Sequence, residues 1–301
     1  EYDSPWKEIL KGYFKDFLEF FLSEAHAGID WQHPPEFLDK ELDRITREAE
    51  SVNRRVDLLV KVWLRDGNEL WVLIHVEVQG NRASDFAERM YTSQYRAYDL
   101  HRKPVIGLAI LADEESRWRP STYGYEKWGS GMQCRFNAIK LLDYLENLDS
   151  LEQSDNPFAI VTLAHLTGKQ TRNQPDKRYQ EKHRITRSLY QRGFNRQKII
   201  DLYRFIDWVL NLSEEADDRF WEDLSNFEEN KTMQYVTSVE RIGMRKGEQQ
   251  GQAKLLLNIL QERFGLVPET VQEQVTSACL DDINAWARKI FKADSLQAVF
   301  Q

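Results

Sequence analysis

Residues 55–80 read RVDLLVKVWLRDGNELWVLIHVEVQG, and this stretch decides the fold. It contains two runs rich in β-branched and aromatic residues, residues 55–64 and 69–79. Between them stands Asp66-Gly67-Asn68, and two such runs joined by a short glycine-containing segment are typical of a β-hairpin. The sequence therefore predicts two antiparallel strands.

The second strand of this hairpin has an apolar face and a polar face. Side chains alternate between the two faces of a strand, so Val76 and Val78 share one face while His75, Glu77 and Gln79 share the other. A surface strand shows the same alternation. The meaning of the polar face depends on what else the chain brings to it.

The first strand offers a carboxylate, Asp57, for the same face. A pairing of Asp57 with Glu77 requires a three-residue loop of Asp66, Gly67 and Asn68 centred on the glycine. Like charges directly opposite each other destabilise a strand pair, so this register calls for a compensating cation. A divalent ion such as Mg²⁺ fits, because Mg²⁺ is held in proteins by one or two carboxylates, water and substrate phosphate.

The elements around the hairpin predict an α/β core. Residues 4–25 carry apolar residues at helical spacing, and a second helix is expected after Pro34 and Pro35, with Glu41 on its apolar stripe. An inward glutamate needs a partner. Residues 83–100 predict a helix and residues 105–112, VIGLAILA, a buried strand. This order favours a mixed central sheet flanked by helices.

The chain beyond residue 141 predicts mostly helices, and the expected division has four parts. Residues 1–168 form the α/β domain, 169–240 a basic and then acidic helical extension, 241–254 a linker and 255–301 a small helical domain. The linker is inferred from Gly243, Gly247 and Gly251, because glycine disfavours a helix; a helix with a bare face is the alternative. Three short C-terminal helices make a thin core, which predicts association with a second subunit.

Composition describes an ordinary soluble chain. The sequence has 301 residues, 41% of them hydrophobic, no apolar run long enough for a membrane helix and no signal-peptide pattern at its beginning. Cys134 and Cys279 are too few and too far apart for a disulfide framework or a zinc site. We expect a cytoplasmic protein.

Positive charge is concentrated in one segment of an acidic chain. The net charge is −8, yet residues 169–198 contain ten Lys or Arg and two acids. We interpret this basic island, with Arg184 and Arg187, either as a phosphate contact or as a solvated helix face.

Asp57, then Glu77-Val78-Gln79 about twenty residues later, with Glu41 upstream, resembles the PD-(D/E)xK nuclease superfamily. Flanking stretches such as EFLDKEL, VLIHVEVQG, FAERMYTSQYRAYDL, LAILAD and NPFAIVTLAHL are similar to the recombination-promoting nuclease and transposase-like family, whose members often have E-x-Q in place of E-x-K. The stretch LLLNILQERFGLVPETVQEQV resembles the helical domain that accompanies many of them.

This resemblance implies a restriction-endonuclease-like fold and a Mg²⁺-dependent DNA endonuclease, with Mn²⁺ or Ca²⁺ as alternative ions. Asp57 and Glu77 would hold the metal, with the Val78 carbonyl as a further ligand and Glu41 as an outer carboxylate. Gln79 would orient the attacking water without supplying the charge of the usual lysine.

Further candidate residues follow from their places in the predicted elements. Lys61 shares the strand face of Asp57 and could return an ammonium to the site, or contact DNA or solvent instead. His75 is a candidate phosphate donor or a packed histidine. On the helix at 83–100, Arg89 is a candidate phosphate clamp or a solvated residue, and Gln94 lies on the apolar stripe, where an amide needs a polar partner.

Two functions therefore remain open. The first is a DNA endonuclease acting as a homodimer or larger assembly. The second is a nuclease fold without catalysis that binds DNA or a protein. A complete transposase is disfavoured, because no end-recognition motif such as a helix-turn-helix is evident.

Overall fold

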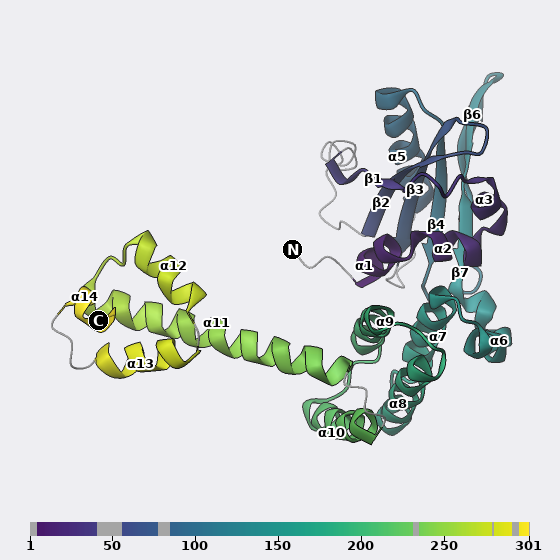
Figure 1. Cartoon of the computed structure of the whole chain (residues 1–301). Coiled ribbons are helices and arrows are strands. Elements are labelled where there is room, and N and C mark those ends of the chain that lie inside the picture. The colour runs from purple at the N-terminus through teal and green to yellow at the C-terminus, as the bar shows by residue number, and fades with distance from the viewer. Residues whose placement is uncertain are drawn as a thin grey trace. The chain divides into compact units, whose positions relative to one another are not determined.

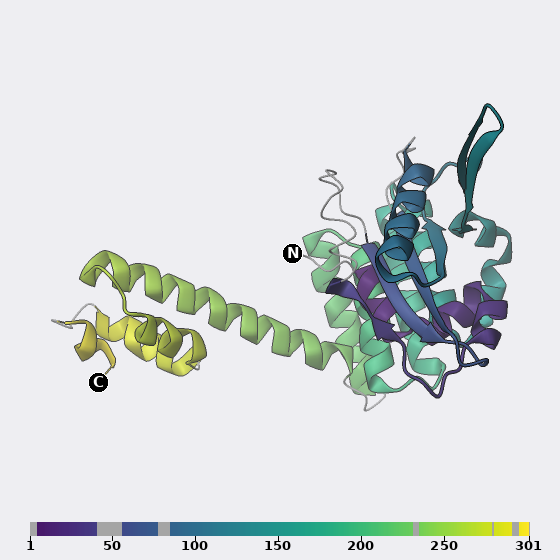
Figure 2. The same cartoon turned by 90° about the horizontal axis from the view of Figure 1, so that it is seen from above.

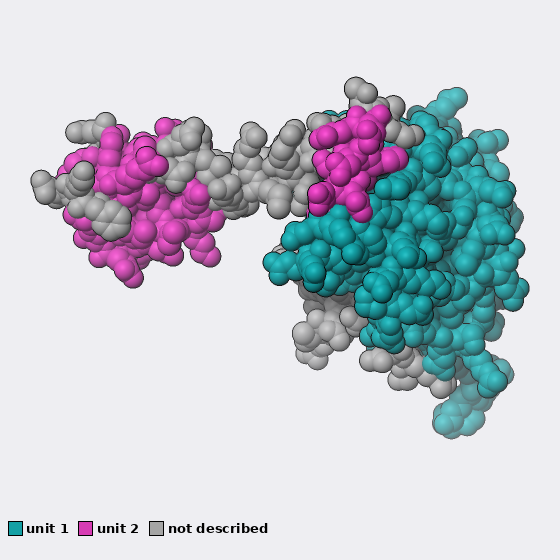
Figure 3. All heavy atoms as spheres, turned by 90° about the horizontal axis from the view of Figure 1, so that it is seen from below, with its two compact units in different colours: residues 1–220 teal, residues 221–301 magenta. Residues whose placement is uncertain are grey.

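The computed structural model describes residues 5–40, 56–77, 85–230, 235–278, 280–290 and 295–300. Two compact units, Glu1–Phe220 and Trp221–Gln301, are distinguished by colour in Figure 3. Each is described by itself.

Unit 1 is built on a mixed five-stranded sheet (Figure 1). The strand order is β1-β2-β3-β4-β7, with β1 and β2 and also β2 and β3 antiparallel, while β3, β4 and β7 are parallel. The bounds are β1 Glu36–Phe37, β2 Val56–Trp63, β3 Glu69–Glu77, β4 Val105–Leu111 and β7 Asn137–Lys140. The predicted α/β class with a mixed sheet flanked by helices is confirmed.

Both faces of this sheet are buried. On one face, Leu59 and Trp71 pack against Ala97 of α5 (Phe86–His101), and Ala109 and Leu111 pack against the first turns of the same helix. On the other face, alternate residues are buried as well, and α1 (Pro5–Gly12) contacts β2. The central strands are therefore apolar on both sides, as strands covered by helices usually are.

A second sheet consists of two strands, β5 (Thr122–Lys127) and β6 (Ser130–Arg135). In both cartoon views this hairpin projects from the rest of unit 1 (Figures 1 and 2). The glycine-containing stretch after Trp118 thus forms a β-ribbon, and β7 was not predicted.

The remainder of unit 1 is helical, as predicted. The helices are η1 Leu141–Asn147, α6 Leu148–Gln153, α7 Pro157–Gln170, α8 Pro175–Gln191, α9 Arg196–Val209 and α10 Glu214–Asn230, which ends in unit 2. Asn156 and Asn195 cap α7 and α9, since their side chains accept hydrogen bonds from the backbone amides of Phe158 and Lys198.

The N-terminal expectations need correction. Residues 4–25 do not form one helix: α1 ends at Gly12, and α2 (Phe14–Phe21) and α3 (Ser23–Gly28) follow. Phe37 and Leu38, expected on a helix, are extended, because the Leu38 amide donates to the Leu59 carbonyl at the edge of the sheet. Glu41 lies outside the described residues.

Unit 2 consists of α11 (Val236–Phe264), α12 (Glu269–Ser277), α13 (Leu280–Ile290) and α14 (Leu296–Phe300), together with the end of α10. Leu256, Leu260, Val275 and Ile283 belong to its buried core. The predicted linker at 241–254 is wrong, because these residues continue α11. The residues between the glycines are mostly strong helix formers, which offsets the glycine penalty of roughly 1 kcal/mol each.

Within the described part of the chain, no helix has both the length and the hydropathy needed to cross a membrane.

Candidate active site

The β2–β3 hairpin positions the proposed metal ligands, and its register differs from the predicted one by two residues. Asp57 lies opposite His75, and Trp63 opposite Glu69 closes the ladder. The Leu64 amide donates to the Asn68 carbonyl, which leaves a loop of three residues centred on Asp66. Gly67 is the third residue of this loop and has a φ of +84°. A three-residue hairpin loop commonly needs a left-handed residue at that position, which favours glycine there rather than at the centre.

The corrected register keeps Asp57 and Glu77 on one face of the sheet. A shift of two residues preserves the face of every residue. Glu77 is therefore a diagonal neighbour of Asp57 rather than its direct partner, at a typical distance of about 7–8 Å between Cα atoms. The carboxylates of Asp57 and Glu77 therefore do not occupy directly opposite positions, yet both residues lie near the same end of the sheet.

Several predicted site residues cannot be placed further. Val78 and Gln79 lie outside the described residues, as Glu41 does, and only the backbone of Asp57, His75 and Glu77 is described. No group of three or more His, Cys, Asp or Glu that could hold a metal occurs among the described residues.

Lys61 is held away from Asp57. Its Nζ lies 2.7 Å from an oxygen of Glu36 on β1 and 4.6 Å from the ring centroid of Trp63. Trp63 is two residues closer to the hairpin loop, whereas Asp57 lies four residues in the other direction. Of the alternatives open for Lys61, the return of its ammonium to Asp57 is therefore not what the structure shows, because Glu36 and Trp63 engage it.

Gln94 finds a polar partner for its amide oxygen, while its buried Nε2 has none among the described residues. Its side chain is only 8% exposed and lies directly over Gly107 of β4, where an added Cβ would come within 1.6 Å of Nε2. The Cys134 thiol donates to Gln94 Oε1 at 2.8 Å. The amide links α5 to β6. This packing role explains its buried position without a substrate contact.

Arg89 stays close to its own helix. Its Nε is 3.4 Å from an oxygen of Asp85, and its guanidinium carbon is 5.7 Å from the ring centroid of Phe86. Neither contact tests the predicted phosphate clamp.

The basic island makes structural contacts within unit 1. Lys182 is fully buried, with Nζ 2.6 Å from Asp207 and 3.1 Å from Asp217. Arg184 binds Glu152 and Glu181 at 2.5 and 2.7 Å.

Arg178 and Arg192 of the same island donate to backbone carbonyls at helix ends. Arg187 is exposed. The positive charge of this segment thus largely serves helix packing, which spacing along the chain could not reveal.

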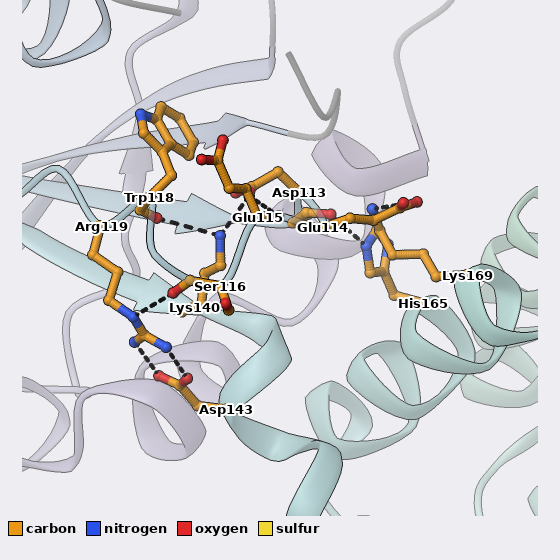
Figure 4. Close-up of polar contacts among 11 residues, drawn as sticks. Asp113, Glu114, Glu115, Ser116, Trp118, Arg119, Lys140, Asp143, His165 and Lys169 are labelled. Carbon is orange, nitrogen blue, oxygen red and sulfur yellow. Dashed lines mark hydrogen bonds and ion pairs between the residues drawn. The ribbon is translucent and has the colours of Figure 1, made fainter. Parts of the chain in front are cut away.

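A buried ion pair lies at the end of the sheet where Glu77 is placed (Figure 4). Lys140 Nζ is 2.5 Å from Asp113 Oδ1, and the two side chains are 1% and 3% exposed. The register aligns Glu77 with Leu111 and Leu111 with Lys140. Lys140 therefore occupies the same row as Glu77, two strands or roughly 10 Å away.

Neighbouring groups hold this ion pair in place. The Lys140 ammonium also donates to the Trp118 carbonyl at 3.3 Å, and Asp113 Oδ1 accepts from the Glu115 amide. Next to it, Arg119 forms a two-pronged pair with Asp143 (Figure 4). Sequence reasoning missed this cluster, although Asp113 directly follows the apolar run that predicted β4.

His165 on α7 is buried beside the end of the same strand. One ring nitrogen, Nε2, lies 3.0 Å from the Ala112 carbonyl, and Lys169 and Glu114 are its charged neighbours. Burial lowers the pKa of His165 from its ordinary 6.5 to about 4, and the positive charge of Lys169 acts in the same direction. His165 is therefore neutral at physiological pH and donates to Ala112 from Nε2.

We expect this histidine to make stability depend on pH. Between pH 6.5 and 4 the unfolded chain binds a proton at His165 that the folded chain does not, so stability falls as pH falls through this window. The expected loss between pH 7.5 and 5 is about 2 kcal/mol.

Urea denaturation of wild type and His165→Gln at both pH values measures this loss. The glutamine can still donate to Ala112 but does not titrate. The free energy of unfolding of His165→Gln should therefore fall by about 2 kcal/mol less than that of wild type between pH 7.5 and 5. Equal falls in the two proteins would show that His165 is not the group responsible.

Compared with family models, curated proteins and solved structures, the chain gives no match.

Proposed function

We propose that this chain is a metal-dependent DNA endonuclease of the recombination-promoting nuclease type. The observation that carries the proposal is the register of the β2–β3 hairpin, which places Asp57 and Glu77 as diagonal neighbours on one face of adjacent strands. The mixed sheet supports it, since β4 and β7 continue in parallel from β3 and bring further polar residues to the same end.

The positions of these two residues fit a hard divalent ion. Diagonal neighbours on a strand pair are close enough for longer side chains to meet, and Mg²⁺ sites commonly take one or two carboxylates with ligand distances of about 2.0–2.1 Å. Asp57 and Glu77 would hold the ion, with the Val78 carbonyl as a further ligand and Glu41 as an outer carboxylate. A bound Mg²⁺ polarises the scissile phosphate and lowers the pKa of a bound water.

Other residues take the remaining roles. Gln79, two residues after Glu77 in the sequence, would orient the attacking water through its amide. His75, whose strand position is opposite Asp57, would contact a phosphate. Lys61 is not assigned a role, because its ammonium binds Glu36.

A second copy of the chain would supply the second active site needed to cut both strands of a duplex. Assembly through unit 2 belongs to the same proposal, although unit 2 has an apolar core of its own.

Nicking of supercoiled plasmid tests this function. We expect wild type to convert the plasmid to the open-circular form in Mg²⁺ or Mn²⁺ and to leave it intact in EDTA. Inactivity in Mg²⁺, Mn²⁺ and Ca²⁺ alike, with DNA binding retained, would contradict the proposal and favour a non-catalytic DNA-binding protein.

A further inference from the structure

The β5–β6 hairpin presents an exposed tryptophan at its tip. Trp128 is 94% exposed, and two strands of six residues, each about 20 Å long, separate it from the body of unit 1. A large apolar side chain left in solvent at the end of a projecting ribbon gains nothing from burial within the chain.

The backbone at this tip is also unusual for tryptophan. Lys127 and Ser130 close a two-residue turn in which Trp128 has a φ of +55° and Gly129 a φ of +74°. Positive φ at both positions defines a type I′ turn, which favours Asn or Asp before the glycine, because an ordinary side chain is strained there. Trp128 is thus unfavourable both for the turn and for solvation, which points to a use outside the folded chain.

Aromatic rings continue from this tip to α5. Tyr125, 64% exposed, and Tyr123 share one face of β5; the Tyr123 ring stacks on Tyr91 with centroids 5.3 Å apart, and Tyr91 stacks on Tyr95 at 6.0 Å. We call these four tyrosines and Trp128 the aromatic strip. Of its members, Trp128, Tyr125 and Tyr95 are exposed.

Positive charge accompanies the strip. Residues 117–135 contain four Lys or Arg and one acid, although Arg119 is paired with Asp143 and the acid Glu88 accepts a hydrogen bond from Tyr123 at the base of the strip. The Lys127 ammonium lies 5.1 Å from the Trp128 ring centroid. Unlike the cations of the basic island, Lys127 forms no ion pair within the described part of the chain; Arg135, opposite Thr122, lies on the other face of the hairpin.

Exposed aromatic rings beside a cation without an ion-pair partner suit one chemistry in particular. Proteins that bind single strands stack bases on aromatic side chains while positive groups follow the phosphates. Duplex readers instead place polar groups at base edges in the grooves. We propose that the β5–β6 hairpin is an arm that binds unpaired DNA, with bases stacked on Trp128 and the exposed Tyr125 and a phosphate near Lys127.

This inference rests on the proposed function in one respect, which is the choice of DNA as the polyanion. It goes further by specifying that the bound DNA is unpaired. It does not depend on the metal site. Binding can therefore be measured in EDTA, apart from cleavage.

Fluorescence anisotropy of a fluorescein-labelled 20-nucleotide oligo(dT) in EDTA tests the arm. We expect wild type to bind and Trp128→Asn to bind roughly tenfold more weakly, because one stacked base is lost. Trp128→Phe keeps a ring and should stay within about threefold of wild type. Trp208→Ala, which removes another partly exposed tryptophan of unit 1, is the matched control and should bind as wild type does.

The choice of asparagine separates binding from folding. Asparagine suits a type I′ turn better than tryptophan, so Trp128→Asn should melt at the wild-type temperature or above it. A lower affinity in a protein that melts normally therefore reports the lost ring.

Four results would overturn the proposal: no binding of oligo(dT) by wild type, equal binding by Trp128→Asn, an equal or larger loss on a duplex of the same length, or tighter binding of oligo(rU) than of oligo(dT). Failure of the proposed function looks different, because wild type would then bind oligo(dT) through Trp128 but nick no plasmid.

Discussion

Replacement of Lys140 with methionine is expected to lower the free energy of unfolding by about 3–5 kcal/mol. Methionine has a similar length but no charge, so the change leaves the Asp113 carboxylate buried without its cation. An unpaired buried charge is strongly unfavourable, whereas the intact pair is worth much less than this difference suggests. Urea denaturation at pH 7 measures the effect.

A double substitution separates the ion pair from the packing around it. Asp113→Asn with Lys140→Met removes both charges while the asparagine oxygen can still accept from the Glu115 amide. This protein should recover most of the stability lost in Lys140→Met. A single variant that loses less than about 1 kcal/mol would show that the pair is not buried as described.

Replacement of Glu77 with alanine is expected to reduce Mg²⁺-dependent plasmid nicking by more than about 100-fold. Changes to residues that only support metal ligands already lower affinity or activity by about 10–100-fold, so the loss of a ligand should exceed that range. The measurement is the initial rate of conversion of supercoiled to open-circular plasmid.

Glu69→Ala is the matched control for this change. Glu69 begins the same strand and lies on the same face, eight residues from Glu77, where it pairs with Lys103 at 3.0 Å on the surface. Its loss should leave the nicking rate within about twofold and stability within about 1 kcal/mol. Activity of Glu77→Ala equal to that of Glu69→Ala would remove Glu77 from the site.

The sequence predicted the elements of the sheet better than their alignment. The β2 and β3 strands, α5 and β4 follow from alternation, helical spacing and an unbroken apolar run. The register was wrong by two residues, because the prediction centred the loop on Gly67 while the backbone needs glycine at the left-handed third position. The predicted sheet face of each residue is still correct, because a shift by an even number of residues leaves every side chain on the same face.

Contacts between distant segments were beyond sequence reasoning. Asp113 and Lys140 are 27 residues apart and meet only because β4 and β7 are neighbours in the sheet. In the same way, the cations of the basic island are held by acids and carbonyls of other helices, such as Asp207 for Lys182. A count of charges along the sequence cannot distinguish cations that are paired within the fold from cations that are available to bind phosphate.

Glycine positions alone do not tell a helix from a turn in this chain. Gly243, Gly247 and Gly251 indicated a linker, yet α11 runs through all three. Gly129, in contrast, does occupy a turn, with a φ of +74°. Neighbouring residues decide between the two outcomes, since strong helix formers surround the first set and β-formers flank the second.

Titration of the whole chain with Mn²⁺, followed by the electron paramagnetic resonance signal of the free ion, measures directly whether Asp57 and Glu77 hold a divalent metal. Wild type and Glu69→Ala should bind the ion with the same affinity, while Asp57→Asn and Glu77→Ala should bind it at least about tenfold more weakly. Unchanged binding in both site variants, or no binding by wild type, would contradict a metal site at this hairpin.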